Sequence, residues 1–235
     1  MRFSLYPRTS ILVTRLCVTS PPTLCVLIMK KITNGFLICV EGIDGSGKSL
    51  FTKALNQKLN ADGYATLLTR EPGGTPLGER IRELLFDTQT PPCHQAEFLL
   101  FAASRAQHCH DLIAPALNLG KIVISDRMAD SSLVYQGYVR GLSLDFIRSV
   151  NTWAMNSLAP RVIFYLKVDA NTAFNRISNR AIERCDFEDS LAPLEKAIEG
   201  FDTVFAGNKS VITLDATQSP EDILFQGIQA LRKFL

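Results

Sequence analysis

A glycine-rich segment near the start of the chain constrains the fold more than any other feature of this 235-residue sequence. Residues 42–49 read Gly-Ile-Asp-Gly-Ser-Gly-Lys-Ser, which matches the pattern G-x-x-x-x-G-K-[ST]. The segment follows a short apolar run at residues 36–40, typical of a buried parallel strand, and it opens an amphipathic stretch over residues 48–61. The pattern therefore predicts a strand, a tight loop and a helix in immediate succession.

Short apolar runs and longer amphipathic stretches continue to alternate as far as the C-terminus. We expect further strands at residues 65–69, 121–125, 161–168 and 210–214, and further helices at residues 77–86, at residues 94–113 and from about Pro220 onward. Strands separated by helices imply right-handed crossovers and a parallel sheet. The expected fold class is therefore α/β, with three layers and a five-stranded parallel sheet covered by helices on both faces.

The composition fits one such domain and argues against several other classes of protein. Hydrophobic residues make up 46% of the chain and charged residues 20%, which is too apolar for a disordered protein. No uninterrupted apolar stretch approaches the roughly 20 residues that span a bilayer, so we expect no membrane partner. The net charge of +2 is too small to indicate a nucleic-acid partner. The six cysteines show no paired spacing and indicate reduced intracellular thiols.

Residues 1–34 form a leader that differs in charge from the rest of the chain. The first 35 residues hold five basic groups and no acidic one, whereas the remainder holds 20 basic and 23 acidic groups, a net charge of −3. The leader fits translated upstream sequence with Met29 as the natural start, or an organelle-targeting peptide; a secretory signal fits less well, because two prolines interrupt its apolar run. We therefore expect the folded domain to comprise residues 35–235, in the cytoplasm or, with a targeting leader, in an organelle.

The glycine-rich segment predicts a site for the phosphates of a nucleoside triphosphate. Its glycines let the backbone approach the phosphates closely, so that N–H groups and the helix N-terminus point at phosphate oxygens. Lys48 is expected to bridge the β and γ phosphates, and the Ser49 hydroxyl to bind Mg²⁺. The expected contacts of ATP are Gly42, Ile43, Asp44, Gly45, Ser46, Gly47, Lys48 and Ser49.

Two arginines each follow directly on an expected strand. Arg70 and Arg127 therefore lie where parallel α/β sheets bind their ligands. The planar guanidinium group can grip a phosphate at two points. Both residues are candidates for holding a second, phosphorylated substrate, and an ordinary surface ion pair is the alternative for each.

Several further sequence blocks accompany the glycine-rich segment. They are Thr-Arg-Glu-Pro-Gly-Gly-Thr at 69–75, Glu-Phe-Leu-Leu-Phe-Ala-Ala-Ser-Arg-Ala-Gln-His at 97–108, Ser-Asp-Arg at 125–127, Ser-Ser at 131–132 and Tyr-Gln-Gly at 135–137. From Gly35 to the C-terminus, the chain resembles the thymidylate kinase family in its bacterial form. The resemblance implies that ATP phosphorylates dTMP to dTDP with Mg²⁺, that the protein is a homodimer, and that a mobile lid covers residues 175–190.

The resemblance also implies a role for each residue beside dTMP. Arg70 and Arg127 would hold its phosphate, Phe101 would stack on thymine, Arg105 would donate to the O4 carbonyl, Ser132 would meet the other edge of the base, Tyr135 would exclude a ribose 2′-hydroxyl, and Gln136 would support the base or the sugar. Two alternatives stay open. Phe101 could belong to the core, and Tyr135 with Gln136 could be a packing element at a helix edge.

The residues expected to act in phosphoryl transfer are Lys48, Arg127, Asp44, Arg180 and Arg184. By the resemblance, Asp44 approaches the acceptor, and the two lid arginines neutralise the transferring group. Asp126 is the expected carboxylate for Mg²⁺, held through water, and an ion pair with Arg127 or Arg105 is the alternative.

The lid departs from the family pattern at Asp186, where a basic residue is usual; Arg184 would substitute for it. Two other functions therefore stay open. The chain could be another P-loop deoxynucleoside or nucleotide kinase, or a catalytically weakened nucleotide-binding protein.

Overall fold

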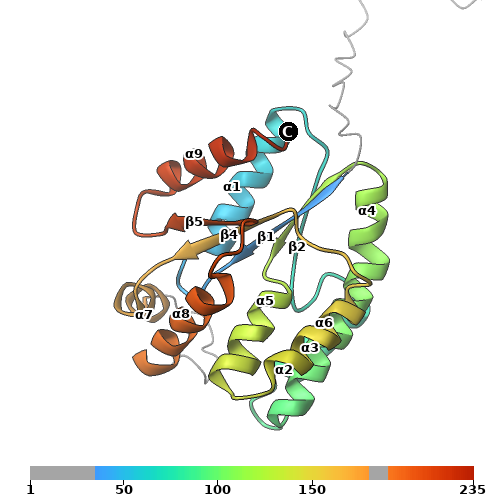
Figure 1. Ribbon diagram of the computed structural model, residues 1–235, viewed down its shortest axis with the longest axis vertical. Helices are drawn as coiled ribbons and strands as arrows, with labels where there is room; N and C mark the ends of the chain where they lie inside the picture. Colours follow the sequence, from blue (N-terminus) through green and yellow to red (C-terminus); the bar gives the residue numbers. More distant parts are fainter. Residues whose placement is uncertain (1–34, 180–189) are drawn as a thin grey trace, which may run out of the picture.

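Five parallel strands form the centre of the computed structural model, which describes residues 35–179 and 190–235 (Figure 1). Their spatial order is β2-β3-β1-β4-β5. The strands are β1 (Phe36–Glu41), β2 (Thr66–Arg70), β3 (Ile122–Asp126), β4 (Val162–Lys167) and β5 (Val211–Asp215). Each lies within one or two residues of its expected position, so the expected α/β class and the parallel sheet are confirmed. The expected leader and the lid arginines Arg180 and Arg184 lie outside the described residues.

Helices cover both faces of this sheet (Figure 1). They are α1 (Lys48–Ala61), α2 (Pro76–Leu85), α3 (His94–His108), α4 (Ala114–Asn118), α5 (Ala129–Ser132), α6 (Leu144–Ala154), α7 (Ala170–Ser178), α8 (Leu191–Phe205) and α9 (Pro220–Leu231), with π-helical segments η1 (Cys109–Ile113) and η2 (Leu133–Val139). Helix α1 has its expected bounds, whereas the expected helix over residues 94–113 changes to π-helical geometry at Cys109. Helices α4, α5, α6, α7 and α8 are additions to the expected elements. Among these described helices, none is long and apolar enough to cross a membrane.

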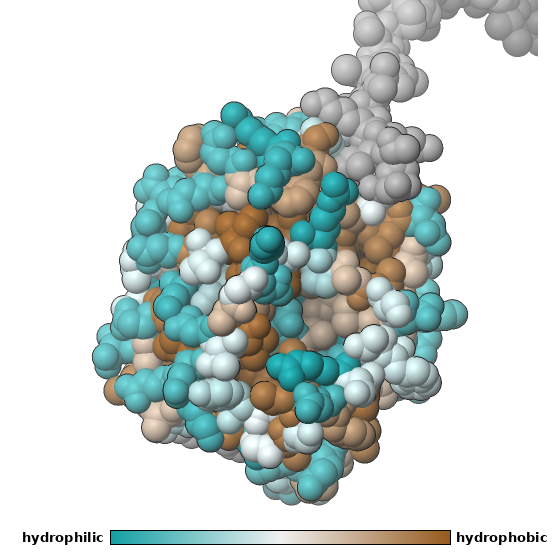
Figure 2. Space-filling view, in the orientation of Figure 1, coloured by the Kyte–Doolittle hydropathy of each residue, from teal (hydrophilic) through white to brown (hydrophobic). Residues whose placement is uncertain are grey.

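The central strands β1 and β3 are apolar except at their carboxyl ends, as expected of strands covered on both faces. All six residues of β1 are buried, and Ile122, Val123 and Ile124 of β3 are fully inaccessible. In contrast, β5 lies at the edge of the sheet and has only one buried residue, Leu214. Polar side chains cover most of the visible surface of the described part, with apolar side chains between them (Figure 2). The core therefore follows the continuous apolar runs of the inner strands.

The register of the strands brings the functional loops to one edge of the sheet. Asp126 at the end of β3 pairs with Val40 of β1 on one side and with Arg70 of β2 on the other. The backbone N–H of Arg127 then donates to the Val40 carbonyl at 2.9 Å. The glycine-rich loop after β1 therefore lies beside the residues that follow β2 and β3.

Replacing Ile124 by alanine should lower the free energy of unfolding by about 2–5 kcal/mol, because it leaves a cavity in the hydrophobic core that covers the sheet. The matched control is Ile212→Ala, the same deletion on the edge strand β5, where the side chain is only partly buried. Its cost should be clearly smaller. Urea unfolding followed by circular dichroism measures both changes, and equal losses would contradict the burial pattern.

Candidate active site

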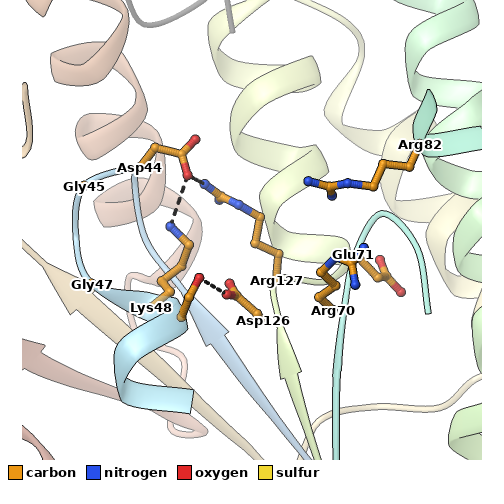
Figure 3. Close-up of a pocket in the computed structure, with 10 residues that line it drawn as sticks. Asp44, Gly45, Gly47, Lys48, Arg70, Glu71, Arg82, Asp126 and Arg127 are labelled. Carbon is orange, nitrogen blue, oxygen red and sulfur yellow. Dashed lines mark hydrogen bonds and ion pairs between the residues drawn. The ribbon is translucent and has the colours of Figure 1, made fainter. Parts of the chain in front are cut away.

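A pocket of about 180 Å³ lies at the carboxyl edge of β1, β2 and β3 (Figure 3). Its lining residues are Asp44, Gly45, Gly47, Lys48, Ser49, Arg70, Glu71, Arg82, Asp126 and Arg127. Four of these side chains are cationic and three are acidic. The pocket therefore concentrates guanidinium and ammonium groups beside a glycine-rich loop, which indicates a ligand that carries several negative charges.

The glycine-rich loop has a backbone that only glycine adopts readily. Gly42, Gly45 and Gly47 have φ angles of +144°, +78° and +91°, and a side chain at Gly45 would meet the Ala173 carbonyl at 2.4 Å. Gly47 faces open space at the start of α1 and supplies no side-chain cap to the first N–H groups of that helix. The Ser46 hydroxyl is buried and has no partner among the described residues. Uncapped N–H groups and an unpaired hydroxyl fit phosphate oxygens.

Lys48 lies folded over this loop. Its ammonium group donates to the Ile43 carbonyl at 2.8 Å and lies 3.5 Å from a carboxylate oxygen of Asp44. Burial, together with the nearby charge of Arg127, lowers the pKa of Lys48. Negative charge on a bound phosphate would favour the charged lysine, so Lys48 is suited to contact phosphate rather than to act as an isolated surface cation.

A hydroxyl and a carboxylate meet beside the glycine-rich loop. Ser49 Oγ donates to Asp126 Oδ2 at 2.7 Å, which joins the first turn of α1 to the end of β3. Magnesium takes oxygen ligands and usually binds through one or two carboxylates plus substrate phosphates. Within residues 35–179 and 190–235, no group of three or more His, Cys, Asp or Glu side chains could hold a metal alone. The pair therefore fits a magnesium ion that shares its ligands with a polyphosphate.

Arg127 is the most firmly held cation of the pocket. Its guanidinium group donates to the Gly42 carbonyl and to Ser131 Oγ, each at 3.0 Å, and to Asp44 at 2.6 Å. Its guanidinium carbon also lies 5.2 Å from the centre of the Tyr135 ring. Figure 3 shows Lys48 and Arg127 converging on the Asp44 carboxylate. Arg127 therefore connects the glycine-rich loop with the segment that follows β3.

Arg70 and Arg82 complete the cationic lining of the pocket. Arg70 pairs with Glu79 at 2.8 Å and remains half exposed. Arg82 donates to the Pro72 carbonyl at 3.1 Å and extends toward Arg127 (Figure 3). Arg82 was not among the expected ligands. The signal that could have found it is its place four residues after Gly78, on the face of α2 that turns inward.

Arg105 contacts Glu71 of the pocket lining and is almost completely buried, with 1% exposure. It donates to Glu71 at 2.8 Å, to Asn151 at 2.7 Å and to Ser132 at 3.2 Å. The structure therefore brings together Arg105 and Ser132, the two residues expected at the base. The sequence leaves open an ion pair of Asp126 with Arg127 or Arg105. Among the described residues, Asp126 bonds with Ser49, and the buried ion pair of Arg105 is with Glu71.

The other residues expected beside dTMP have different surroundings. Phe101 is half-buried and belongs to neither hydrophobic cluster of the described residues, which argues against the alternative that it is core. Tyr135 packs edge-on against Phe201, with 6.2 Å between ring centres. Gln136 is buried and donates to Glu97 at 3.0 Å. The structure therefore places Gln136 as a link between η2 and α3.

A glycine-rich phosphate loop between β1 and α1, the strand order β2-β3-β1-β4-β5 and the facing arginines define a P-loop nucleotide kinase. The family model for thymidylate kinase matches residues 40–226. The chain belongs to the thymidylate kinase family.

Bacterial thymidylate kinases match nearly over their whole length. The thymidylate kinase of Halothermothrix orenii is 41% identical over 191 residues, which cover 80% of this chain and 92% of the relative. That of Finegoldia magna is 39% identical over 198 residues, covering 83% and 97%. That of Bacillus licheniformis is 41% identical over 198 residues, covering 81% and 92%.

Proposed function

We propose that this pocket carries out the reaction of the family, the transfer of the γ-phosphoryl group of ATP to dTMP, which yields dTDP and ADP. The observation that carries the proposal is the position of three arginines opposite the glycine-rich loop. The loop and Lys48 suffice for the phosphates of ATP, whereas Arg70, Arg82 and Arg127 provide for a second phosphate. A kinase whose acceptor is an uncharged nucleoside has no need of them.

The donor half consists of the loop, Lys48, Ser49 and Asp126. Backbone N–H groups and the start of α1 hold the phosphates of ATP. Ser49 and Asp126 would hold Mg²⁺, which when bound neutralises charge on the transferring phosphates. Lys48 supplies a further positive charge from inside the loop. Arg176 braces this half, because its guanidinium donates to the carbonyls of Gly45 and Ala216 at 3.3 and 3.0 Å.

The acceptor half combines a phosphate grip with a base pocket. Arg127 holds the dTMP phosphate together with Arg70 and Arg82, and Asp44 keeps Arg127 directed toward the loop. Phe101 stacks on thymine.

Polar and aromatic side chains complete this half. Arg105 and Ser132 form the polar edge that reads the base. Tyr135 lies under Arg127 and closes the space beside the sugar.

Phosphoryl transfer requires positioning and charge neutralisation more than covalent help. Lys48 and Arg127 lie on either side of Asp44 and hold the donor and the acceptor close together. The lid residues Arg180 and Arg184, which lie outside the described residues, remain the predicted additional cations.

An ADP-release assay with four acceptors tests the proposed reaction. We expect fastest turnover of dTMP, slower turnover of dUMP and of the ribonucleotide of thymine, and none of thymidine, which lacks the phosphate that the arginines bind. Chelation of Mg²⁺ should abolish activity. Turnover of roughly 1–100 s⁻¹, the usual range for kinases, would exclude a weakened nucleotide-binding protein. Phosphorylation of thymidine alone would instead favour a deoxynucleoside kinase.

Arg82→Gln should raise the KM for dTMP by about 10–100-fold and leave the KM for ATP unchanged, because it removes a charged hydrogen-bond donor to the acceptor phosphate. Arg80→Gln is the matched control, since Arg80 is exposed two residues earlier on the same helix and does not line the pocket. Steady-state kinetics in both substrates measures the difference. Equal effects of the two substitutions would refute a specific contact of Arg82 with dTMP.

We also propose that two copies pair through the face formed by α2, α3 and α6, which lie side by side in Figure 1. Large apolar side chains are exposed along this face: Leu77, Leu84, Phe86, Leu99, Phe146 and Trp153. Trp153 is 81% exposed, which is unfavourable for a large aromatic side chain in water. Burial of this face between two copies would remove that exposure.

Sedimentation equilibrium tests the pairing of the two copies. Phe146→Asp should shift the protein from dimer to monomer, because it places a charge in the apolar contact. Phe225→Asp is the control, since Phe225 is similarly exposed but lies on α9, outside this face. A dimer that persists with Asp at residue 146, or one lost with Asp at residue 225, would contradict the assignment of the face.

A further inference from the structure

Glu41 is a completely buried carboxyl group that the donor and acceptor halves described above do not include. It ends β1, immediately before the glycine-rich loop. Its Oε1 atom accepts the backbone N–H of Met128 at 2.8 Å, and its Oε2 atom accepts the hydroxyl of Ser131 at 2.6 Å. Both oxygens are therefore bonded to the segment that follows β3.

These two hydrogen bonds lie on either side of Arg127. Met128 is the next residue in the chain, so its N–H fixes the backbone directly after Arg127. Ser131 Oγ, which donates to Glu41, also accepts from Arg127 Nη1 at 3.0 Å. One oxygen of Glu41 thus restrains the backbone next to Arg127 through the Met128 N–H. The other restrains the guanidinium group of Arg127 through the Ser131 hydroxyl.

The backbone of Arg127 needs such support. Its φ angle of +68° lies in the left-handed region, which is uncommon for a residue other than glycine and persists only where its surroundings hold it. The Arg127 N–H donates to Val40, and its carbonyl accepts the Ser125 hydroxyl at 2.7 Å. Glu41 adds a third restraint from the neighbouring strand.

We propose that Glu41 is a positioning residue that aims Arg127 at the acceptor phosphate, acting through Ser131 and the Met128 backbone. Glu41 has this role only if Arg127 holds the phosphate of dTMP, as proposed above. A carboxylate suits the position because it accepts two hydrogen bonds at once, whereas a glutamine has one acceptor oxygen and would present a donor to either Met128 or Ser131.

A carboxyl group is costly at this position, which argues against a merely passive role. Burial, and next the charge of Asp130, raise the pKa of Glu41 to about 7, although Arg127 and the two hydrogen bonds act in the opposite direction. Burial likewise raises the pKa of Asp130 to about 6. An apolar side chain in this core would avoid the cost but would leave both donors unpaired.

Binding of dTMP and of thymidine, measured by titration calorimetry, separates positioning from general damage. The two ligands share base and sugar, and only dTMP carries the phosphate that Arg127 holds. Glu41→Gln and Ser131→Ala should each weaken dTMP binding about tenfold, the loss expected from a misplaced charged hydrogen bond, and leave thymidine binding unchanged. Ser131→Thr keeps the hydroxyl and should retain dTMP binding.

Glu71→Gln is the matched control, because Glu71 is another buried carboxylate that holds Arg105 instead of Arg127. It should weaken binding of both ligands. Ser131→Ala keeps the test decisive if Glu41→Gln fails to fold, as judged by circular dichroism.

The outcomes distinguish the two proposals. If the wild-type protein does not phosphorylate dTMP, the proposed function fails. If the wild-type protein is active, the role of Glu41 is overturned by any of three results: normal dTMP binding in both Glu41→Gln and Ser131→Ala, equal losses for the two ligands, or a Ser131→Thr protein that binds dTMP as weakly as Ser131→Ala.

Discussion

The parallel pairing of β1 with β3 is the constraint on which the rest of the site depends. It sets Val40 opposite Asp126, so that the glycine-rich loop and the segment after β3 leave the sheet at the same point. Ser49 can then reach Asp126, and Arg127 can reach both Gly42 and Asp44. Because the side chains of a strand alternate between faces, a shift of one residue would direct Asp126 to the opposite face of the sheet. The apolar residues of β1 and β3, buried on both faces, keep this register in place.

A pocket that gathers four cations must offset their mutual repulsion before any substrate binds. The structure does so with acidic partners at the rim: Asp44 serves both Lys48 and Arg127, and Glu79 serves Arg70. The contact between Arg70 and Glu79 is about half exposed, so it contributes little stability and exchanges readily for a phosphate oxygen. Asp44 therefore holds Arg127 firmly at the glycine-rich loop, whereas Glu79 directs Arg70 without binding it strongly.

The sequence predicted those parts of the molecule that depend on local pattern. The apolar runs located all five strands, and the spacing of the glycines located the loop that lines the pocket. The contacts of Arg105 could not be predicted in the same way, because Glu71 and Asn151 lie 34 and 46 residues away in the chain. Arg82 and the role inferred for Glu41 depend likewise on how α2 and the segment after β3 pack. The sequence thus pointed to the glycine-rich loop, Arg70, Asp126 and Arg127 of the pocket lining, but not to Arg82 or to the residues that hold the arginines in place.

Arg105 and Arg70, which we propose for the two ends of the acceptor site, differ in freedom, and the difference matches what each end would have to do. Arg105 is 1% exposed and is bonded to four other residues, so its guanidinium group is fixed before a base arrives. A fixed edge discriminates between bases because a mismatched group would be left unpaired in a dry site. Arg70 is half exposed at the end of β2, and its side chain can adjust its position. At the proposed phosphate end, Arg127 is held by Gly42, Ser131 and Asp44, so Arg70 would supply the movable charge there during transfer. In the proposed acceptor site, the buried Arg105 would give rigid recognition at the base, and the half-exposed Arg70 would add an adjustable charge beside the firmly held Arg127.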